Sequence, residues 1–181
     1  MTRFLYIALT TVIAGSVAVS AVINPLPRFI WNASKSASIG LYAVQPAGDP
    51  TVGSMVAAQP PMPLARWMAV RHYVPLGIPL IKHVAAKAGQ HVCRNKDVVR
   101  VDGKVVGKAR ERDSHGRDLP SWSGCRTLSS GQIFLMNTDV PDSLDGRYFG
   151  PFPAATVIGR VTPILTRDAP DRRLKWRGFP F

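Results

Sequence analysis

Apolar residues occur along the chain as one long N-terminal segment followed by many short runs. The long segment, Phe4 to Ile23, holds twenty residues without a charge, which is about the length of a helix that spans a bilayer. The short runs are rich in Val and Ile, are separated by Gly and Pro, and show no heptads or repeat of fixed period. We expect strands at Val52–Ala58, Ile78–Ala86, Gln90–Cys93, Val98–Val101, Gln132–Met136 and Val157–Leu165. The sequence therefore predicts a mainly β domain of short antiparallel strands with little helix beyond the N-terminal segment.

The N-terminal segment has two interpretations, a membrane anchor that is retained and a secretory signal peptide that is removed. The prolines of Asn24–Pro27 end the helix because each of them lacks a backbone N–H. Small residues near Ala18 and Ala21 would suit a cleavage site. In both interpretations the rest of the chain is exported. We expect residues 1–29 to be the anchor or signal segment, 30–166 the main domain and 167–181 a basic tail.

Four further segments carry local signals. Leu64 to Tyr73 follows a proline-rich loop and is a candidate helix. Asp102-Gly103 lies between "VVRV" and "KVV" and predicts a β-hairpin, because both turn positions favour a positive φ. Lys108 to Gly124 is polar and turn-rich, so we expect a surface excursion there. Asp171 to Phe181 lacks periodicity, and we expect a frayed tail.

The chain is strongly basic, with 23 Lys and Arg against 11 Asp and Glu and a formal net charge of +12. Such a chain is attracted to anionic partners. Nucleic acid is not expected, because the basic residues are scattered outside one cluster, Arg167 to Arg177, and no nucleic-acid-binding motif is present. Anionic lipid at a membrane surface explains the charge at least as well, and a solvated basic surface explains it without any partner.

The two cysteines, Cys93 and Cys125, suit an exported protein. In an oxidising compartment they predict one disulfide, which closes a loop of about thirty residues and stabilises the fold by roughly 3–4 kcal/mol. A metal site would need more ligands, and although His91 lies near Cys93, no second cluster accompanies Cys125. We expect no metal and no cofactor.

Candidate chemistry begins in Asn32–Tyr42, "NASKSASIGLY", where three serines and a lysine follow the apolar segment. The stretch is either a polar linker or a nucleophile segment. A serine attacks only when a base lies within hydrogen-bond reach. Histidine is the usual base, but none of the four carries a recognisable motif, which disfavours a Ser–His–Asp triad. The histidines considered are His72, His83, His91 and His115.

Lysine is the alternative base, and Lys82 is the candidate. In a strand from Ile78 to Ala86 its side chain shares a face with Leu80 and Val84, so the ammonium lies among apolar side chains. Burial disfavours the charged form, and lowering the pKa of a lysine from about 10.4 toward 7 takes roughly 4 kcal/mol, which desolvation can supply. The competing interpretation is an ordinary strand lysine that extends to solvent.

A third candidate lies in Asn137–Gly150. Asp145 and Arg147 flank a glycine, so a tight turn brings the carboxylate and the guanidinium together as a charge-assisted pair. Taken alone, such a pair is more typical of a structural turn than of a site.

Together these pieces resemble the signal peptidase I superfamily and, within it, the TraF-type peptidases of bacterial conjugative transfer. The resemblance covers about residues 30–165. "NASKSASIGLY" is similar to the nucleophile segment of that family, "PLIKHVAAKAG" to its lysine segment and "DSLDGRYFGP" to its late Asp-x-Arg-Tyr segment. Two stretches that contain the cysteines, "VCRNKDVVRVDGKVV" and "GCRTLSSGQIFLM", resemble the TraF branch.

The resemblance implies a signal-peptidase-like β fold and a role for each candidate residue. Ser36 is implied as the nucleophile and Lys82 as the neutral general base. The hydroxyl of Ser34 and the backbone N–H of Ser36 would form an oxyanion hole, in which each donor is worth about 3 kcal/mol. The supporting residues, which orient Lys82 and hold its loop, would be Ser143, Asp145 and Arg147.

Two positions depart from the family pattern, because Ser38 stands where proline is usual and Gly146 where serine is common. Neither departure removes a reacting group. Gly53-Ser54-Met55 superficially copies a leader-peptidase motif, but no proline follows it, which disfavours Ser54 as the nucleophile. Lys35 is disfavoured as the base because neighbouring side chains of an extended segment point apart.

The implied activity is endoproteolysis of an exported substrate by a serine peptidase at the periplasmic face of the bacterial inner membrane. The expected partners are a pilin precursor, anionic lipid of the membrane surface and other conjugative transfer proteins. Acyl transfer that closes the pilin into a ring is a further implication of the resemblance. The alternative is a non-catalytic, membrane-tethered β module of a pilus or secretion assembly.

Overall fold

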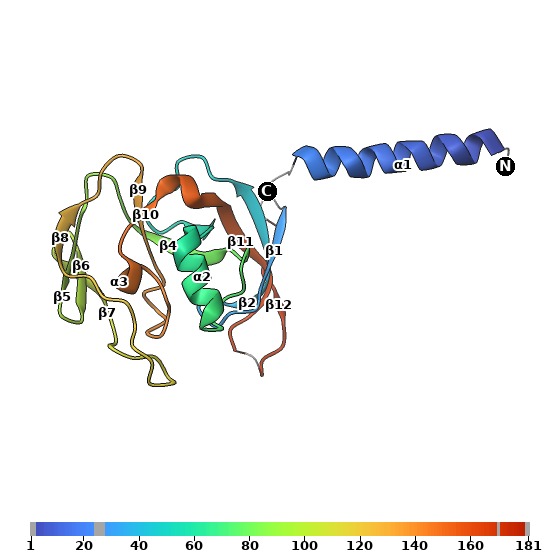
Figure 1. The fold of residues 1–181 in the computed structure, drawn as a ribbon. Helices are drawn as coiled ribbons and strands as arrows, with labels where there is room; N and C mark the ends of the chain where they lie inside the picture. Colours follow the sequence, from blue (N-terminus) through green and yellow to red (C-terminus); the bar gives the residue numbers. More distant parts are fainter. Residues whose placement is uncertain (1–2, 24–27, 170, 180–181) are drawn as a thin grey trace.

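The computed structural model describes residues 3–23, 28–169 and 171–179, and strands dominate its main domain (Figure 1). The larger of two sheets has the strand order β1-β2-β11-β3-β4-β9-β10, with β12 paired to β11. Its strands are β1 (Phe29–Asn32), β2 (Ile39–Pro46), β3 (Met55–Ala58), β4 (Leu80–Lys87), β9 (Gln132–Met136), β10 (Phe152–Pro153), β11 (Val157–Arg167) and β12 (Lys175–Trp176). Every pair is antiparallel. The prediction of a mainly β fold is confirmed.

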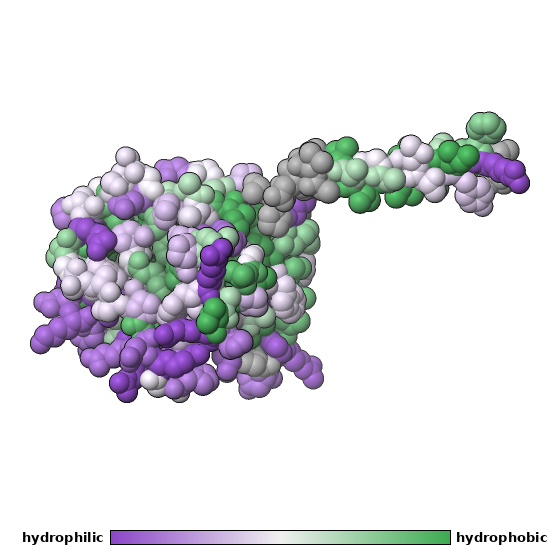
Figure 2. All heavy atoms as spheres, viewed as in Figure 1, coloured by the Kyte–Doolittle hydropathy of each residue, from purple (hydrophilic) through white to green (hydrophobic). Residues whose placement is uncertain are grey.

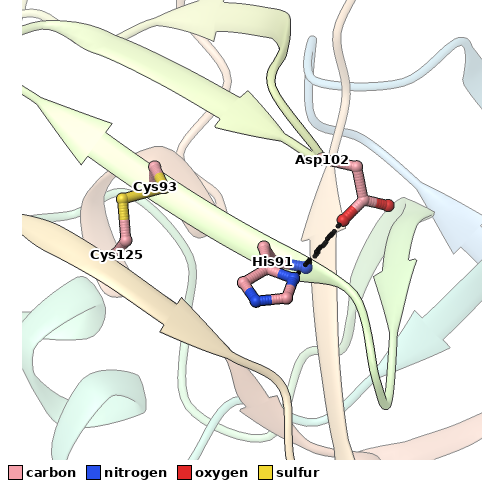
Figure 3. Close-up of a disulfide and its surroundings, with 4 residues drawn as sticks. All are labelled: His91, Cys93, Asp102 and Cys125. Carbon is pink, nitrogen blue, oxygen red and sulfur yellow. Dashed lines mark hydrogen bonds and ion pairs between the residues drawn. A yellow bond between two sulfur atoms is a disulfide. The ribbon is translucent and has the colours of Figure 1, made fainter.

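The smaller sheet has the order β7-β6-β5-β8. Its strands are β5 (His91–Asn95), β6 (Val98–Val101), β7 (Lys104–Lys108) and β8 (Gly124–Thr127). The predicted hairpin between β6 and β7 is confirmed, with φ of 46° at Asp102 and 80° at Gly103. Cys93 and Cys125 occupy paired positions on β5 and β8 and form the predicted disulfide (Figure 3). Asp102 also accepts a hydrogen bond from the backbone N–H of His91 at 2.8 Å, which ties the hairpin turn to the start of β5.

The helices are α1 (Arg3–Ile23), α2 (Met62–Val70), α3 (Gly146–Phe149) and the 3-10 turn η1 (Ala154–Thr156). The candidate helix is confirmed as α2, although it starts two residues earlier and ends at Val70 instead of Tyr73. Pro63 fits in the first turn because an N–H there needs no partner. Among the described residues, no helix combines the length and the hydropathy of a membrane span. The predicted helix end at residues 24–27 lies outside the described residues. The anchor or signal segment stays a prediction.

The core lies on both faces of the central strands. One buried cluster joins the two sheets, and a second lies on the opposite face of the larger sheet, against α2. A third cluster consists of Tyr42, Ala57, Ile81 and Val161. Successive side chains of β9 alternate between the first two clusters, because Phe134 and Met136 belong to the first and Ile133 and Leu135 to the second. Strand β4 pairs with both β3 and β9, so its side chains enter the interior. This placement decides the environment of Lys82.

The structure contains strands that the sequence did not predict, among them β1, β2 and β8, and β4 begins at Leu80 instead of Ile78. It also differs from the sequence-based expectation in β3 and in the tail. Strand β3 begins at Met55 instead of Val52, because Gly53 adopts a φ of 91° in the preceding turn. The tail is also not simply frayed, since Lys175–Trp176 pairs with β11. The guanidinium of Arg177 then binds the carboxylate of Asp168 at 2.8 Å.

Candidate active site

The nucleophile segment is a short loop between β1 and β2 that the buried side chain of Asn32 holds together. Its Nδ2 donates to the carbonyls of Ser34, Ala37 and Ser38 at 3.0–3.1 Å. Its Oδ1 accepts from the backbone N–H of Ser34 at 3.1 Å and from the Ser34 hydroxyl at 2.9 Å. One amide therefore organises the whole loop that carries Ser36.

The glycine that follows this loop allows two strands to approach closely. Gly40 has a φ of 145°, and a Cβ at this position would lie 2.1 Å from the carbonyl oxygen of Leu165 on β11. Any other residue would push β2 away from β11. The glycine at position 40 of the nucleophile segment is thus explained by the close packing of β2 against β11.

Ser34 and Ser36 are brought together as the sequence predicts, with their hydroxyl oxygens 3.0 Å apart. The hydroxyl of Ser34 has one proton, and the bond to Asn32 Oδ1 uses it. For Ser34 to act as an oxyanion donor, that proton has to turn toward the substrate. The rotation leaves Asn32 Oδ1 satisfied, because this oxygen keeps the bond from the Ser34 backbone N–H.

Lys82 lies on β4 and is only 2% exposed, so the interpretation as a lysine extending to solvent is wrong. Its Nζ donates to the hydroxyl of Ser143 at 2.7 Å. Burial lowers the pKa of Lys82 to about 8, the nearby Asp145 carboxylate opposes this shift and Arg147 adds to it. A minor but appreciable fraction of the amine is thus neutral at physiological pH, far more than for a lysine with the ordinary pKa of 10.5.

Ser36 and Lys82 line the same cavity, which has a volume of about 480 Å³. Among the hydrogen bonds of the described residues, none joins the side chains of Ser36 and Lys82, so the two share a pocket without a hydrogen bond between them. The walls are largely apolar and include Ile30, Met68, Val74, Ile78, Ile81 and Leu144. None of the four histidines lines this cavity. The only lysine besides Lys82 on its wall is Lys35, whose residue is exposed.

Asp145 and Arg147 form the predicted pair, and both side chains are almost completely buried, at 0% and 1% exposure. The guanidinium binds both carboxylate oxygens at 2.9 Å and also donates to the carbonyls of Asn137, Val140 and Pro141. Asp145 additionally accepts the backbone N–H of Asn137 at 3.0 Å. The pair therefore closes the loop that carries Ser143.

The glycine between the paired residues has a steric cause. A Cβ at Gly146 would lie 2.6 Å from the ring of Phe134 and 2.9 Å from the carbonyl oxygen of Leu135. A serine does not fit here unless β9 shifts. The departure from the family pattern at this position thus agrees with the close packing of α3 on β9.

Two residues of the site, Asn32 and Asn137, were not predicted from the sequence. Asn137, at the end of β9, is 4% exposed, and its Nδ2 donates to the carbonyl oxygens of Ser36 and Ile81. Its Oδ1 accepts the backbone N–H of His83 at 3.1 Å. Asn137 therefore links the nucleophile loop to the strand on both sides of Lys82. The sequence signal for Asn137 was an amide residue directly after an apolar strand. This pattern is too common to identify a site residue.

Asn137→Ala is expected to lower kcat by about a hundredfold with a smaller change in KM, because a displacement of about 1 Å between reacting groups has this effect. The lost hydrogen bonds should also destabilise the fold by about 2 kcal/mol. Cleavage rates measured well below the melting temperature separate the two effects. The control is Asn95→Ala, an exposed amide on β5. An unchanged kcat in Asn137→Ala would exclude the positioning role.

Comparison with known proteins identifies relatives over most of the chain. Residues 1–166 match a family described as signal peptidase, peptidase S26. A probable conjugal transfer protein TraF of Sinorhizobium fredii is 35% identical over 145 residues, covering 75% of this chain and 76% of its own. A conjugal transfer protein TraF of Agrobacterium fabrum is 32% identical over 149 residues, covering 76% and 82%.

A plasmid transfer protein TraF of Escherichia coli is 28% identical over 144 residues, covering 75% of this chain and 81% of its own. Among solved structures, a signal peptidase I of Enterococcus faecalis aligns with a TM-score of 0.38 and 19% identity, over 64% of this chain and 99% of its own. The match to the family model spans residues 1–166 and so includes every candidate residue of the site. The chain belongs to the signal peptidase S26 family.

Proposed function

We propose that the protein is a membrane-associated serine endopeptidase that uses Ser36 and Lys82 to process an exported pilin precursor in conjugative transfer. The observation that carries the proposal is the buried amine of Lys82, with a pKa of about 8, in the cavity that Ser36 lines. With that pKa, about a tenth of the molecules have a neutral Lys82 at pH 7. Membership of the peptidase family and the names of the transfer proteins support the same role.

In the proposed reaction, neutral Lys82 removes the proton of Ser36, and the alkoxide attacks the scissile carbonyl. The bond from Nζ to Ser143 uses an N–H of the amine, which leaves its lone pair for Ser36. The tetrahedral oxyanion rests on the backbone N–H of Ser36 and the hydroxyl of Ser34. Lys82 then gives its proton to the departing amine, and an acyl group remains on Ser36.

The acyl-enzyme has two fates. Attack by water releases a linear product, whereas attack by an amine of the substrate itself closes a ring with a new peptide bond. Cyclisation is part of the proposal only through the resemblance to the conjugative peptidases. The apolar walls of the cavity favour small or apolar side chains next to the scissile bond.

The proposed location is the periplasmic face of the inner membrane. Ser36 lies thirteen residues beyond Ile23, so even an extended chain keeps it within about 45 Å of the end of α1. A net charge of +12 favours contact with anionic lipid. A substrate anchored in the same membrane would then meet the site in two dimensions.

Mass spectrometry of the pilin that accumulates with and without the full-length protein tests this proposal. With the wild-type protein we expect a shortened pilin, and a further loss of one water if the product is a ring. Cells that express Ser36→Ala should accumulate the uncut precursor. A precursor of unchanged mass in the presence of the wild-type protein would favour the non-catalytic β module instead.

A further inference from the structure

A second cavity, of about 470 Å³, adjoins the candidate active site. It lies between the turn after α2, at Arg71 to Tyr73, and the excursion that the sequence places between the two cysteines. Tyr73, Asp142 and Leu144 line both cavities, so the two share a wall. A cavity of this volume is roughly 10 Å across, which about three extended residues span.

The excursion is folded firmly against the rest of the domain. The carboxylate of Asp113 accepts the hydroxyl of Tyr73 and the Nε of Arg117, and its other oxygen accepts the backbone N–H of His115 and of Arg117. The guanidinium of Arg117 also donates to the carbonyl of Arg71 at 2.9 Å and stacks 4.7 Å above the ring of Tyr73. The second cavity is therefore built by a fixed hydrogen-bond network.

The lining of this cavity is basic. It contains four arginines, Arg71, Arg110, Arg112 and Arg117, and two carboxylates, Asp113 and Asp142. Strongly hydrophilic side chains gather along the lower edge of the molecule in Figure 2, where Figure 1 draws the excursion below β7.

The arginines are available to a ligand to different degrees. Arg117 is committed to Asp113, whose side chain is 8% exposed. Arg112 pairs with Asp118 at the surface, with exposures of 67% and 82%, and pairs of this kind contribute little free energy. Arg71 forms no ion pair among the described residues, and its Nη1 donates to a backbone carbonyl, that of Asp118, at 2.7 Å. An entering carboxylate can therefore bind Arg71 and Arg112 without breaking a buried ion pair.

We propose that this cavity is a subsite that binds acidic side chains of the substrate polypeptide a few residues from the scissile bond. The proposal rests on the proposed peptidase function, because the neighbouring cavity is taken to hold the scissile bond. It assigns a role to the excursion at residues 108–124, which supplies most of the basic wall. The substrate class is then a polypeptide with acidic residues close to its cleavage site.

Binding of two labelled peptides, octaglutamate and octaglutamine, to the full-length protein tests the subsite by fluorescence anisotropy at low salt. We expect octaglutamate to bind and octaglutamine not to bind. Arg71→Gln/Arg112→Gln should weaken octaglutamate binding at least tenfold. The matched control, Arg66→Gln/Arg160→Gln, removes the same charge from two exposed positions that line neither cavity and should leave binding within twofold.

Equal weakening in both double variants would overturn the subsite and indicate attraction to the overall charge. Arg112→Glu, a single change at an exposed position, serves if the double variant does not fold, and it should weaken binding at least tenfold as well. Ser36→Ala should bind octaglutamate like the wild type. If the protein binds octaglutamate through these arginines but leaves the precursor uncut, the proposed function is refuted and the subsite is not. If the protein cleaves the precursor without such binding, the subsite is refuted and the proposed function is not.

Discussion

Lys82→Met is expected to lower kcat/KM for precursor cleavage by about a thousandfold or more, because the active-site cavity then lacks a neutral base for Ser36. Ser36→Ala should have an effect of similar size. The double variant should be no slower than either single one, since the two side chains act as a unit. Single-turnover assays with the purified full-length protein and the pilin precursor measure all three.

The controls use other lysines of this chain. Lys104→Met changes an exposed lysine of β7 outside the active-site cavity and should cleave at the wild-type rate. Lys35→Met removes the other lysine of that cavity, which is next to Ser36 in the chain. It therefore tests whether Lys35 or Lys82 is the base. A Lys82→Met protein that keeps more than about a tenth of the wild-type rate would exclude Lys82 as the base.

The same Lys82→Met substitution should stabilise the protein at neutral pH. The pKa of Lys82 falls from 10.5 to about 8 on folding, so the protonated amine opposes folding by on the order of 3 kcal/mol at pH 7. Loss of the hydrogen bond to Ser143 offsets about 1 kcal/mol of this, which leaves a gain of about 2 kcal/mol. Urea unfolding of both proteins measures the difference.

The pH dependence has a definite direction for both stability and activity. Between pH 8 and 10.5 the unfolded lysine still binds a proton and the folded one does not, so wild-type stability rises with pH. The advantage of Lys82→Met is therefore largest below pH 8 and disappears toward pH 10.5. Wild-type kcat/KM should rise with pH to a plateau above about pH 8. A flat profile across this range would contradict the assignment.

Arg147→Met is expected to destabilise the fold by about 4 kcal/mol, the largest stability effect in this site. The substitution leaves the Asp145 carboxylate buried without its cation and removes the donor from the carbonyls of Asn137, Val140 and Pro141. For a chain of this length, the loss should lower the melting temperature by about 10 °C. Thermal unfolding under non-reducing conditions, which keep the disulfide, measures it.

A double-mutant cycle separates the ion pair from the backbone bonds. Asp145→Asn/Arg147→Met should be less destabilised than the sum of its two single changes by at least about 2 kcal/mol, because no unpaired charge is left. The matched control is the exposed pair of Arg112 and Asp118, where the corresponding changes should each cost less than about 0.5 kcal/mol. Equal losses at the two pairs would show that burial does not decide the energy of the Asp145–Arg147 pair.

Much of the fold could be predicted because its signals are local. The hairpin at Asp102–Gly103 follows from two turn residues that tolerate positive φ. The strand that carries Lys82, with Leu80 and Val84 on the same face, follows from its apolar pattern, although that pattern left open whether the ammonium of Lys82 is buried. The Asp145–Arg147 pair spans a single glycine. In each case the residues that decide the structure are neighbours in the chain.

The parts that could not be predicted depend on residues far apart in the sequence. Asn137 binds the carbonyl of Ser36 across 101 positions, and only the packing of β9 beside the nucleophile loop creates that contact. The second cavity exists because Tyr73 and Asp113, forty positions apart, hold the excursion against the turn after α2. Pairing of the tail with β11 is a contact of the same kind.

The sequence by itself determined the mainly β character, most of the short central strands, the disulfide partners and the residue types needed for a serine and lysine site, since periodicity and turn chemistry act between neighbours. Only the tertiary structure decided that Ser36 and Lys82 share a cavity, that Asn137 binds the carbonyl of Ser36 and that a basic cavity adjoins the site. The physical reason is that a lowered pKa and a hydrogen-bond direction depend on which distant groups exclude water and face each other. Those contacts arise only when the strands, helices and loops that carry these groups pack together.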